Sequence, residues 1–431
     1  MKVLDDFVIL DDNVDLLFAT KGPRSHFFGY YDKSPFSGDG RQLLCQAVDF
    51  DGRIVQEGDK AEIGFWDLTD GSYTRLTETK AFNWQQGSML QWLPGSNYKK
   101  IIFNERSKAN FISVILDLDS GNKHFLPTTI YSLAPNGQYA LTPRFERLYY
   151  CRPGYCYMGI QQPKWNGNLP PGDGIIRMDL RHGSHQLIME TAALANIKMK
   201  ESVHYVEHIM VNPQGSQCIF FHRWFHQPNS IITRLYTCNL DGTELRLFPD
   251  SGFYSHANWI NGDQFIIWGR MLGTYAKVRR SGFATKWLLS PILRFYRKHY
   301  SSPLIDKMKR SVTLDAFLLF SDSAEDPISV GKNILVGDGH PSICPSNSQL
   351  LLVDTYEDSQ NYRHLSLYNM STKTVIELGR FFSPPKFNQT GFRCDLHPRW
   401  SSSGGLVCID TIQGDRRQMM VLDVTKVLEG L

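Results

Sequence analysis

Four histidines occupy matching positions ahead of four successive turns in this sequence. Each stands six or seven residues before a turn residue: His208 before Gly215, His256 before Gly262, His340 before Asn347 and His397 before Gly404. Histidine is scarce here, with 13 among 431 residues, so a shared register in four consecutive units is not expected by chance. Neutral imidazole can accept a proton or bind a metal ion near neutral pH. The pattern therefore predicts a histidine cluster with acid–base or metal chemistry.

Polar residues also follow the strand-like runs that come after these turns. They are His222 and Arg223, Arg270, and Asp354. If these runs return toward the histidines, both arginines face the cluster, where a guanidinium can bind a carboxylate or phosphate through two parallel hydrogen bonds. His208, His222 and Asp354 are then candidate substrate-binding residues.

A metal site is the more specific form of this prediction. Asp395 stands two residues before His397, so the two side chains point the same way if the segment is extended. Together with His340 they offer nitrogen and oxygen ligands suited to Mn²⁺, Fe²⁺ or Zn²⁺. The alternative is that these histidines make only structural hydrogen bonds at the starts of strands.

The elements that must position these residues repeat seven times along the chain. Each unit contains a tight turn rich in Gly, Pro, Asn or Ser, at 37–40, 93–95, 134–137, 212–215, 260–263, 344–347 and 401–404. A strand-like run follows each turn, at 42–47, 100–103, 139–141, 218–221, 264–268, 349–353 and 406–409. Such turns favour hairpins, because Gly and Asn tolerate positive φ and Pro presets the entry.

A second hairpin with an acidic or Gly-containing turn completes most units, for example at 65–71, 116–121 and 238–242. Four-stranded units of roughly 40 to 55 residues predict an all-β, seven-bladed β-propeller, with residues 1–431 as a single domain. A large β-sandwich or two stacked all-β domains are the alternatives. The last unit, from about 393 to 424, is one strand short, and we expect residues 7–10 to supply that strand and close the ring.

A basic segment interrupts the fifth unit. Residues 277–310 hold ten Lys or Arg and one acid, Asp306, a local charge of +9 that leaves −6 for the rest of a chain whose net charge is +3. Aromatic residues such as Trp287 and Tyr296 lie among the cations. We expect a helical insertion at about 277–311 that contacts an anionic membrane surface or an acidic partner. An ordinary surface lid is the alternative.

The remaining composition excludes several classes of protein. A net charge of +3 gives no sign of nucleic-acid binding. Residues 1–6 carry acids where a secretory signal needs an apolar run, and no stretch reaches the roughly 18 apolar residues of a membrane span. The eight cysteines include no CxxC pair and are expected as buried reduced thiols. We expect a cytoplasmic protein, with membrane association through the insertion.

The histidine segments resemble those of the oligogalacturonate lyases and related TolB-like seven-bladed propellers. The resemblance covers about residues 200–425 and rests on 208–215, Phe221-His222-Arg223-Trp224, Ser255-His256-Ala257, Gly339-His340-Pro341 and Asp395-Leu396-His397-Pro398. It implies a Mn²⁺ ion with His340 and His397 among its ligands, His256 as catalytic base, and Arg223 or Arg270 binding the substrate. The implied reaction is β-elimination on an acidic, uronate-containing oligosaccharide, in which neutral imidazole removes the proton beside a neutralised carboxylate.

The sequence departs from this family in its ligand set. Asp395 stands where the family has another histidine, and Gln389 is the one candidate for the family's ligand glutamine. The tyrosine-rich motifs at 29–33 and 152–157 have no role that the sequence predicts. The alternative functions are a non-enzymatic propeller that binds a saccharide or a protein in polysaccharide assembly at the inner membrane face, and a plain scaffold.

Overall fold

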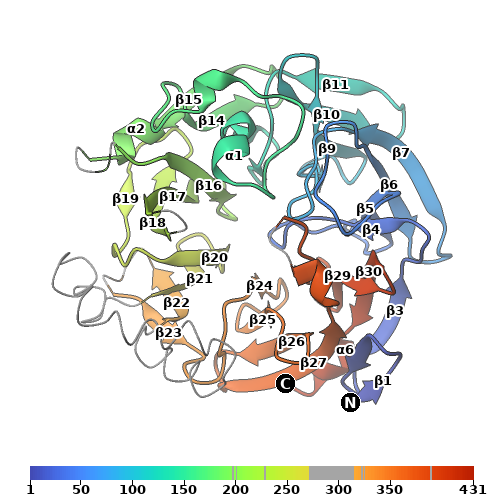
Figure 1. The fold of residues 1–431 in the computed structure, drawn as a ribbon. Coiled ribbons are helices and arrows are strands. Elements are labelled where there is room, and N and C mark those ends of the chain that lie inside the picture. Colours follow the sequence, from blue (N-terminus) through green and yellow to red (C-terminus); the bar gives the residue numbers. More distant parts are fainter. Residues whose placement is uncertain are drawn as a thin grey trace.

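Seven β-sheets stand around a central axis in the computed structural model of this chain (Figure 1). The structure describes residues 1–196, 199, 201–227, 230–270, 315–321, 324, 326–388 and 391–431. Neighbouring strands in each sheet run antiparallel. The all-β, seven-bladed propeller predicted from the repeats is confirmed.

Each blade is a sheet whose strands follow one another from the axis outward. Blade 1 consists of β4 (Ser25–Phe27), β5 (Gln42–Val48), β6 (Ala61–Asp67) and β7 (Tyr73–Thr79), and blade 2 of β8 (Gln91–Trp92), β9 (Lys100–Arg106), β10 (Phe111–Asp117) and β11 (Lys123–Leu126). Blade 3 consists of β12 (Ser132–Leu133), β13 (Tyr139–Thr142), β14 (Gly174–Asp179) and β15 (His185–Glu190), and blade 4 of β16 (His204–Val211), β17 (Gln217–Gln227), β18 (Ser230–Asn239) and β19 (Arg246–Leu247). Blade 5 consists of β20 (Tyr254–Trp259), β21 (Gln264–Arg270), β22 (Asp315–Ser321) and β23 (Ile328–Val330).

The last two blades include the N-terminal strands. Blade 6 consists of β24 (Pro341–Ile343), β25 (Leu350–Asp354), β26 (Tyr362–Asn369) and β27 (Thr374–Phe382), extended by β2 (Val8–Leu10) and β1 (Lys2–Val3). Blade 7 consists of β28 (Arg399–Trp400), β29 (Leu406–Gln413), β30 (Arg416–Asp423) and β3 (Asp15–Ala19). The prediction that residues 7–10 close the ring is therefore wrong: β2 pairs with β27, and β3 pairs with β30. A short apolar run identifies a strand but not the sheet edge that it joins.

The seven predicted strand-like runs all lie in the second strands of the blades, β5, β9, β13, β17, β21, β25 and β29. These strands are nearly continuous apolar runs because each sheet is covered on both faces by its neighbours. In β25, for example, all five residues are buried. The hydrophobic core accordingly lies between blades, and one cluster joins Ile102 of blade 2, Ile175 of blade 3 and Phe220 of blade 4. All eight cysteines are free and buried, as predicted.

Short helices occupy the connections. They are α1 (Phe145–Cys151), α2 (Thr191–Leu194) and α6 (Thr425–Glu429), with 3₁₀ turns at Pro163–Trp165 and Pro385–Asn388. The long connection between β13 and β14 contains α1, which lies inward from its blade in Figure 1. Buried Arg147 of α1 ties this connection to blade 4 by donating to the carbonyl oxygens of Trp165 and His204. The connection thus brings residues 152–157 over the inner ends of the blades.

The basic insertion lies between β21 and β22, where Arg270 pairs with Asp315. The helical structure and membrane contact predicted for 277–311 fall outside the described residues. Among the helices that the structure describes, none has the length and hydropathy needed for a bilayer span.

Ring closure gives a stability prediction. The Phe18 ring of β3 lies 5.4 Å from the Trp66 ring of blade 1, so it joins blade 7 to the next blade. We expect Phe18→Ala to lower the free energy of unfolding by about 2 kcal/mol, because it removes a partly buried aromatic contact between blades. The matched control is Leu17→Ala on the same strand, since Leu17 is 52% exposed. Urea unfolding checks this, and equal effects of the two variants would contradict the closure role of Phe18.

Candidate metal centre in the channel

The four predicted histidines lie on the inner strands or just ahead of them, and the backbone is irregular at three of these positions. The register between β16 and β17 shifts between Glu207 and Met210, where His208 has φ +54°. The register between β20 and β21 shifts across His256, and His397, just ahead of β28, has φ +45°. Bulges and left-handed residues re-aim side chains and are frequent beside functional sites. The inner strands are therefore shaped to present these side chains rather than to continue regular pairing.

The four imidazoles form a continuous arc across blades 4 to 7. The ring centres of His208 and His256 lie 6.2 Å apart, those of His256 and His340 4.0 Å apart, and those of His340 and His397 4.3 Å apart. All four side chains are buried. The structure thus brings together the histidines that the repeat register predicted.

Tyrosines that sequence reasoning left without a role form one wall of this arc. Residues 29–34 cross the channel between β4 and β5 of blade 1. The Tyr30 ring lies 5.4 Å from the ring of His208 and 5.1 Å from that of His397, and the Tyr31 ring lies 5.0 Å from that of His340. We call residues 29–34 the channel segment. In the sequence, the Gly29-Tyr30-Tyr31 motif is the local feature that marks this segment.

The channel segment is anchored to blades that are distant in sequence. The Tyr31 hydroxyl donates to the Ala257 carbonyl oxygen at 2.6 Å and accepts from the Ala257 N–H at 2.9 Å. At its start, Gly29 has φ +139°, and a Cβ there would lie 2.7 Å from the Gln86 carbonyl oxygen. Only glycine fits this crossing without displacing the backbone.

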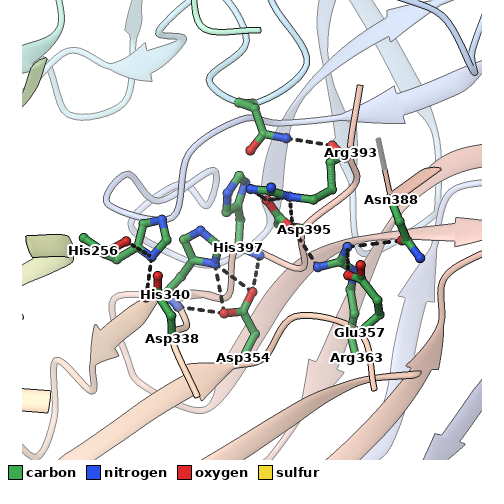
Figure 2. A network of polar contacts seen from close by, with 12 residues as sticks. His256, Asp338, His340, Asp354, Glu357, Arg363, Asn388, Arg393, Asp395 and His397 are labelled. Atoms are coloured by element: carbon green, nitrogen blue, oxygen red, sulfur yellow. Dashed lines mark hydrogen bonds and ion pairs between the residues drawn. The ribbon is translucent and has the colours of Figure 1, made fainter. Parts of the chain in front are cut away.

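One carboxylate fixes two of the histidines (Figure 2). Asp354 Oδ1 accepts from the His340 backbone N–H at 2.7 Å and lies 2.9 Å from His340 Nδ1, while Oδ2 accepts from the His397 backbone N–H at 3.2 Å. The Gly29 carbonyl oxygen lies 2.9 Å from His397 Nδ1. Because these oxygens accept, Nδ1 carries the proton in both rings. Both Nε2 atoms are buried and without a hydrogen-bond partner among the described residues, and in a neutral ring with its proton on Nδ1 the Nε2 atom carries a lone pair.

Close packing holds His340 over Asp354. A Cβ on Gly339 would lie 1.9 Å from the Asp354 carbonyl oxygen, so the chain passes this point only because residue 339 has no side chain. Asp354 itself is 1% exposed. Its contacts are those of a residue that orients the histidines, whereas the sequence suggested substrate binding.

Asp395 completes a trio with these two histidines. His340, Asp395 and His397 each offer one ligand atom, and these atoms all lie within 4.8 Å of one another. Arg393 Nε lies 2.8 Å from both carboxylate oxygens of Asp395, and Arg363 Nη1 lies 2.7 Å from Oδ1. Burial alone would raise the pKa of Asp395, but the two arginines outweigh it and hold the pKa well below its usual range. The carboxylate is ionised at neutral pH.

This arrangement fits a divalent cation. Burial holds the pKa of His397 well below its ordinary value, so the ring stays neutral and its Nε2 stays available. Metal-bound histidines typically donate their other N–H to a carboxylate or a backbone carbonyl, as His340 and His397 do. Two imidazole nitrogens and one carboxylate would hold the ion and leave further positions open to a ligand.

His256 is held in the tautomer that a base needs. Its Nδ1 lies 3.0 Å from Asp338 Oδ1 and 3.2 Å from Ser255 Oγ. With Nδ1 donating to the carboxylate, Nε2 is unprotonated, and it makes no hydrogen bond within the described part of the chain. Burial, with His340 as the next cause, lowers the pKa of His256. His256 is therefore neutral at pH 7.

His208 is engaged on both sides of its ring. The Tyr30 hydroxyl hydrogen-bonds to His208 Nε2. Glu207 Oε1 lies 3.5 Å from Nδ1 and 2.6 Å from Nη1 of Arg223. Burial lowers the pKa of His208 to about 3. Arg223, predicted to bind substrate, thus neutralises a buried carboxylate beside the arc.

Two other predicted residues lie away from the arc. Arg270 pairs with Asp315 through Nε at 2.7 Å and Nη2 at 2.9 Å. His222 lies on the other side of the blade 4 sheet from Arg223, with its ring 5.0 Å from that of His204. Within the described residues, neither Arg270 nor His222 contacts the four histidines. Gln389 falls outside the described residues.

A cavity lies on the side of the channel segment that faces away from the histidine arc. It has a volume of about 720 Å³, and Asp32 and Lys33 line it together with the turns at the opposite ends of the inner strands. Lys33 Nζ donates to Asp32 at 2.7 Å. The channel segment therefore separates this cavity from the histidine arc.

Comparison with known proteins establishes the fold. An oligogalacturonate lyase in complex with manganese has a TM-score of 0.62 and 15% identity, covering 95% of this chain and 92% of that one. An oligogalacturonate lyase from Vibrio parahaemolyticus has a TM-score of 0.61 and 13% identity, covering 97% and 96%. A propeller assigned to TolB from Agrobacterium tumefaciens is more distant, with a TM-score of 0.36 and 10% identity over 93% and 91%. No family model matches the sequence, and no curated protein matches it. The fold seen in the lyases is thus the fold of this chain.

The buried histidines give a pH prediction. Burial lowers the pKa of His222 to about 3, from 6.5 for a free histidine. As pH falls, the unfolded chain takes up this proton first, so the stabilisation present above pH 6.5 is lost between 6.5 and about 3. We expect His222→Gln to reduce the slope of the unfolding free energy against pH by about 1.4 kcal/mol per pH unit in this window. Urea unfolding of chelator-treated protein measures the slope, and exposed His124→Gln is the control. An unchanged slope for His222→Gln would contradict the neutral, buried state of His222.

Proposed function

We propose that this protein is a metal-assisted lyase that cleaves an acidic, uronate-containing saccharide by β-elimination. The observation that carries this function is the pair of buried, unprotonated Nε2 atoms of His340 and His397, gathered with Asp395. A buried polar atom without a partner costs about 1–3 kcal/mol, and a cation would satisfy both nitrogens. The manganese-bound lyase of the same fold supports the assignment.

Mn²⁺ is the favoured ion, since it accepts mixed imidazole and carboxylate ligands, and Fe²⁺ or Zn²⁺ would suit the same donors. His340, Asp395 and His397 would hold it. A divalent cation bound there neutralises a uronate carboxylate and so acidifies the neighbouring C–H. Asp354 and the Gly29 carbonyl keep both histidines in the ligating tautomer.

His256 is the residue we assign as base. Its free Nε2 takes the proton from the carbon beside the carboxylate, and Asp338 stabilises the imidazolium that results. The electron pair released by this C–H bond forms the new C=C bond as the bond from the adjacent carbon to the glycosidic oxygen breaks. The leaving oxygen then takes a proton from solvent, and the imidazolium of His256 returns its proton to solvent.

Saccharide binding without cleavage is the second candidate function. Arg363 and Arg393 already hold the Asp395 oxygens, so a cation must share them. If the arginines rather than a cation occupy the Asp395 oxygens, the protein lacks the cation that the elimination needs. Its arginines would still bind acidic ligands.

The orientation of His340 can be tested through metal affinity. We expect Asp354→Asn to weaken Mn²⁺ binding by about 10–100-fold, because it weakens the acceptor that fixes the histidine tautomer. Asp358→Asn is the matched control, since Asp358 accepts from His364 on the surface of blade 6 at 3.0 Å. Isothermal titration with Mn²⁺ measures both variants. Equal affinities in Asp354→Asn and the control, or no metal binding by the parent protein, would contradict the metal centre.

The base can be tested separately from the metal. We expect His256→Gln to lower kcat on oligogalacturonate by about 10²–10⁴-fold while Mn²⁺ content stays at the parent level. The absorbance of unsaturated uronate products measures the rate. His364→Gln, which changes a histidine bonded to Asp358 and Glu377, is the control. A metal-loaded parent protein that yields no unsaturated product would reject the lyase assignment, and arginine-dependent saccharide binding would then favour the second candidate.

A further inference from the structure

Two arginines and two tyrosines cover the histidine arc. The Tyr155 ring lies 6.2 Å from that of His208, and the Tyr356 ring lies 6.3 Å from that of His340. Arg152 lies over the Tyr155 ring at 4.4 Å, and Arg393 lies over the Tyr356 ring at 4.8 Å. These four residues come from connections of blades 3, 6 and 7. We call them the arginine–tyrosine layer.

Each arginine is paired with a buried carboxylate, Arg152 through Nε alone and Arg393 through one edge of the guanidinium. Arg152 Nε lies 3.3 Å from Glu207 Oε2. Arg393 binds Asp395 through Nε at 2.8 Å and Nη2 at 2.7 Å. A guanidinium that is paired with a carboxylate and stacked on a ring has little freedom left, so its remaining donors are already directed.

The other edges of these two guanidiniums are available to a ligand. The side chains of Arg152 and Arg393 are 23% and 20% exposed. Neither terminal nitrogen of Arg152, nor Nη1 of Arg393, has a hydrogen-bond partner among the described residues. The neighbouring Arg363, by contrast, is 1% exposed and donates to both Asp395 and Glu357.

Both guanidiniums influence the same residue, Tyr155. Burial raises the pKa of Tyr155, and Arg152 and Arg393 both oppose that rise. Two cations near one ring, each with free donors, give this part of the layer a positive potential beside the histidines. Charge-assisted, two-point hydrogen bonding by arginine is the usual means of recognising carboxylates.

We infer that Arg152 and Arg393 form an anion-binding subsite for a second carboxylate of the saccharide, on the sugar unit next to the one that reacts. The identity of this ligand rests on the proposed function, whereas the anion subsite rests on the geometry of the layer. The subsite takes over the role that the sequence suggested for Arg223 and Arg270, whose guanidiniums are paired with Glu207 and Asp315. A substrate of at least two uronate units follows from it.

The test compares ligands with one and two carboxylates. Digalacturonate and galacturonate are titrated by calorimetry into Mn²⁺-loaded full-length protein carrying His256→Gln, in which turnover is slow. We expect Arg152→Gln and Arg393→Gln each to weaken digalacturonate binding about tenfold or more. Galacturonate binding and Mn²⁺ content stay unchanged in Arg152→Gln, whereas Arg393→Gln, which frees Asp395, is compared at saturating Mn²⁺. Arg393→Lys, which keeps the charge beside Asp395, should lose less affinity than Arg393→Gln.

Arg234→Gln is the matched control for these variants. Arg234 also binds a carboxylate, Asp250, at 3.0 Å and stacks on an aromatic ring, that of Trp224, but it lies away from the histidine arc. Digalacturonate affinity in the Arg152 and Arg393 variants equal to that of Arg234→Gln would overturn the subsite. So would failure of the parent protein to bind digalacturonate.

The outcomes also separate the subsite from the lyase function. Arginine-dependent digalacturonate binding without any unsaturated product supports the subsite and rejects the lyase. Product formation by the protein with an intact His256, at the same KM with and without Arg152→Gln, supports the lyase and rejects the subsite.

Discussion

A charged carboxylate in a protein interior is stable only if donors surround it, and Asp354 meets that requirement in a way that organises the whole site. It accepts from the backbone N–H groups of His340 and His397 and from the His340 ring. Removing such a partner leaves a buried charge uncompensated, at a cost of about 3–5 kcal/mol. The same contacts of Asp354 therefore stabilise the channel and orient the two imidazoles. This arrangement leaves the Nε2 atoms of both histidines without a hydrogen-bond partner among the described residues.

Burial keeps three imidazoles of the arc neutral although ionised carboxylates lie beside them. Asp395 and Glu207 lie between arginines, so both carboxylates stay ionised despite burial, and burial lowers the pKa values of His208, His256 and His397. Protons are excluded from the nitrogens while negative charge is held beside them. A site with neutral nitrogen ligands and one ionised carboxylate is ready for a cation without first releasing protons.

The channel segment gives this propeller a feature that strand counting does not reveal. A ring of seven sheets leaves an axial space, and residues 29–34 cross it with side-chain hydroxyls that bond to blades on several sides. Tyr31 pairs with Ala257 in blade 5, and Ser34 donates to Trp400 in blade 7 at 2.8 Å. One side of the segment meets the histidines, and the other lines the 720 Å³ cavity.

The sequence by itself determined the blades and the histidine register, because turn chemistry and buried apolar runs are local signals and the repeat multiplies them. It also determined the trio of His340, Asp395 and His397, since a two-residue spacing and a shared blade position place side chains predictably. Only the tertiary structure decided the rest. The Tyr30–His208 contact joins residues 178 positions apart, and Arg223 of β17 pairs with Glu207 of the neighbouring strand β16. Which sheet edge β2 joins, and which arginines keep free donors, depend likewise on contacts between distant segments, for which no local pattern exists.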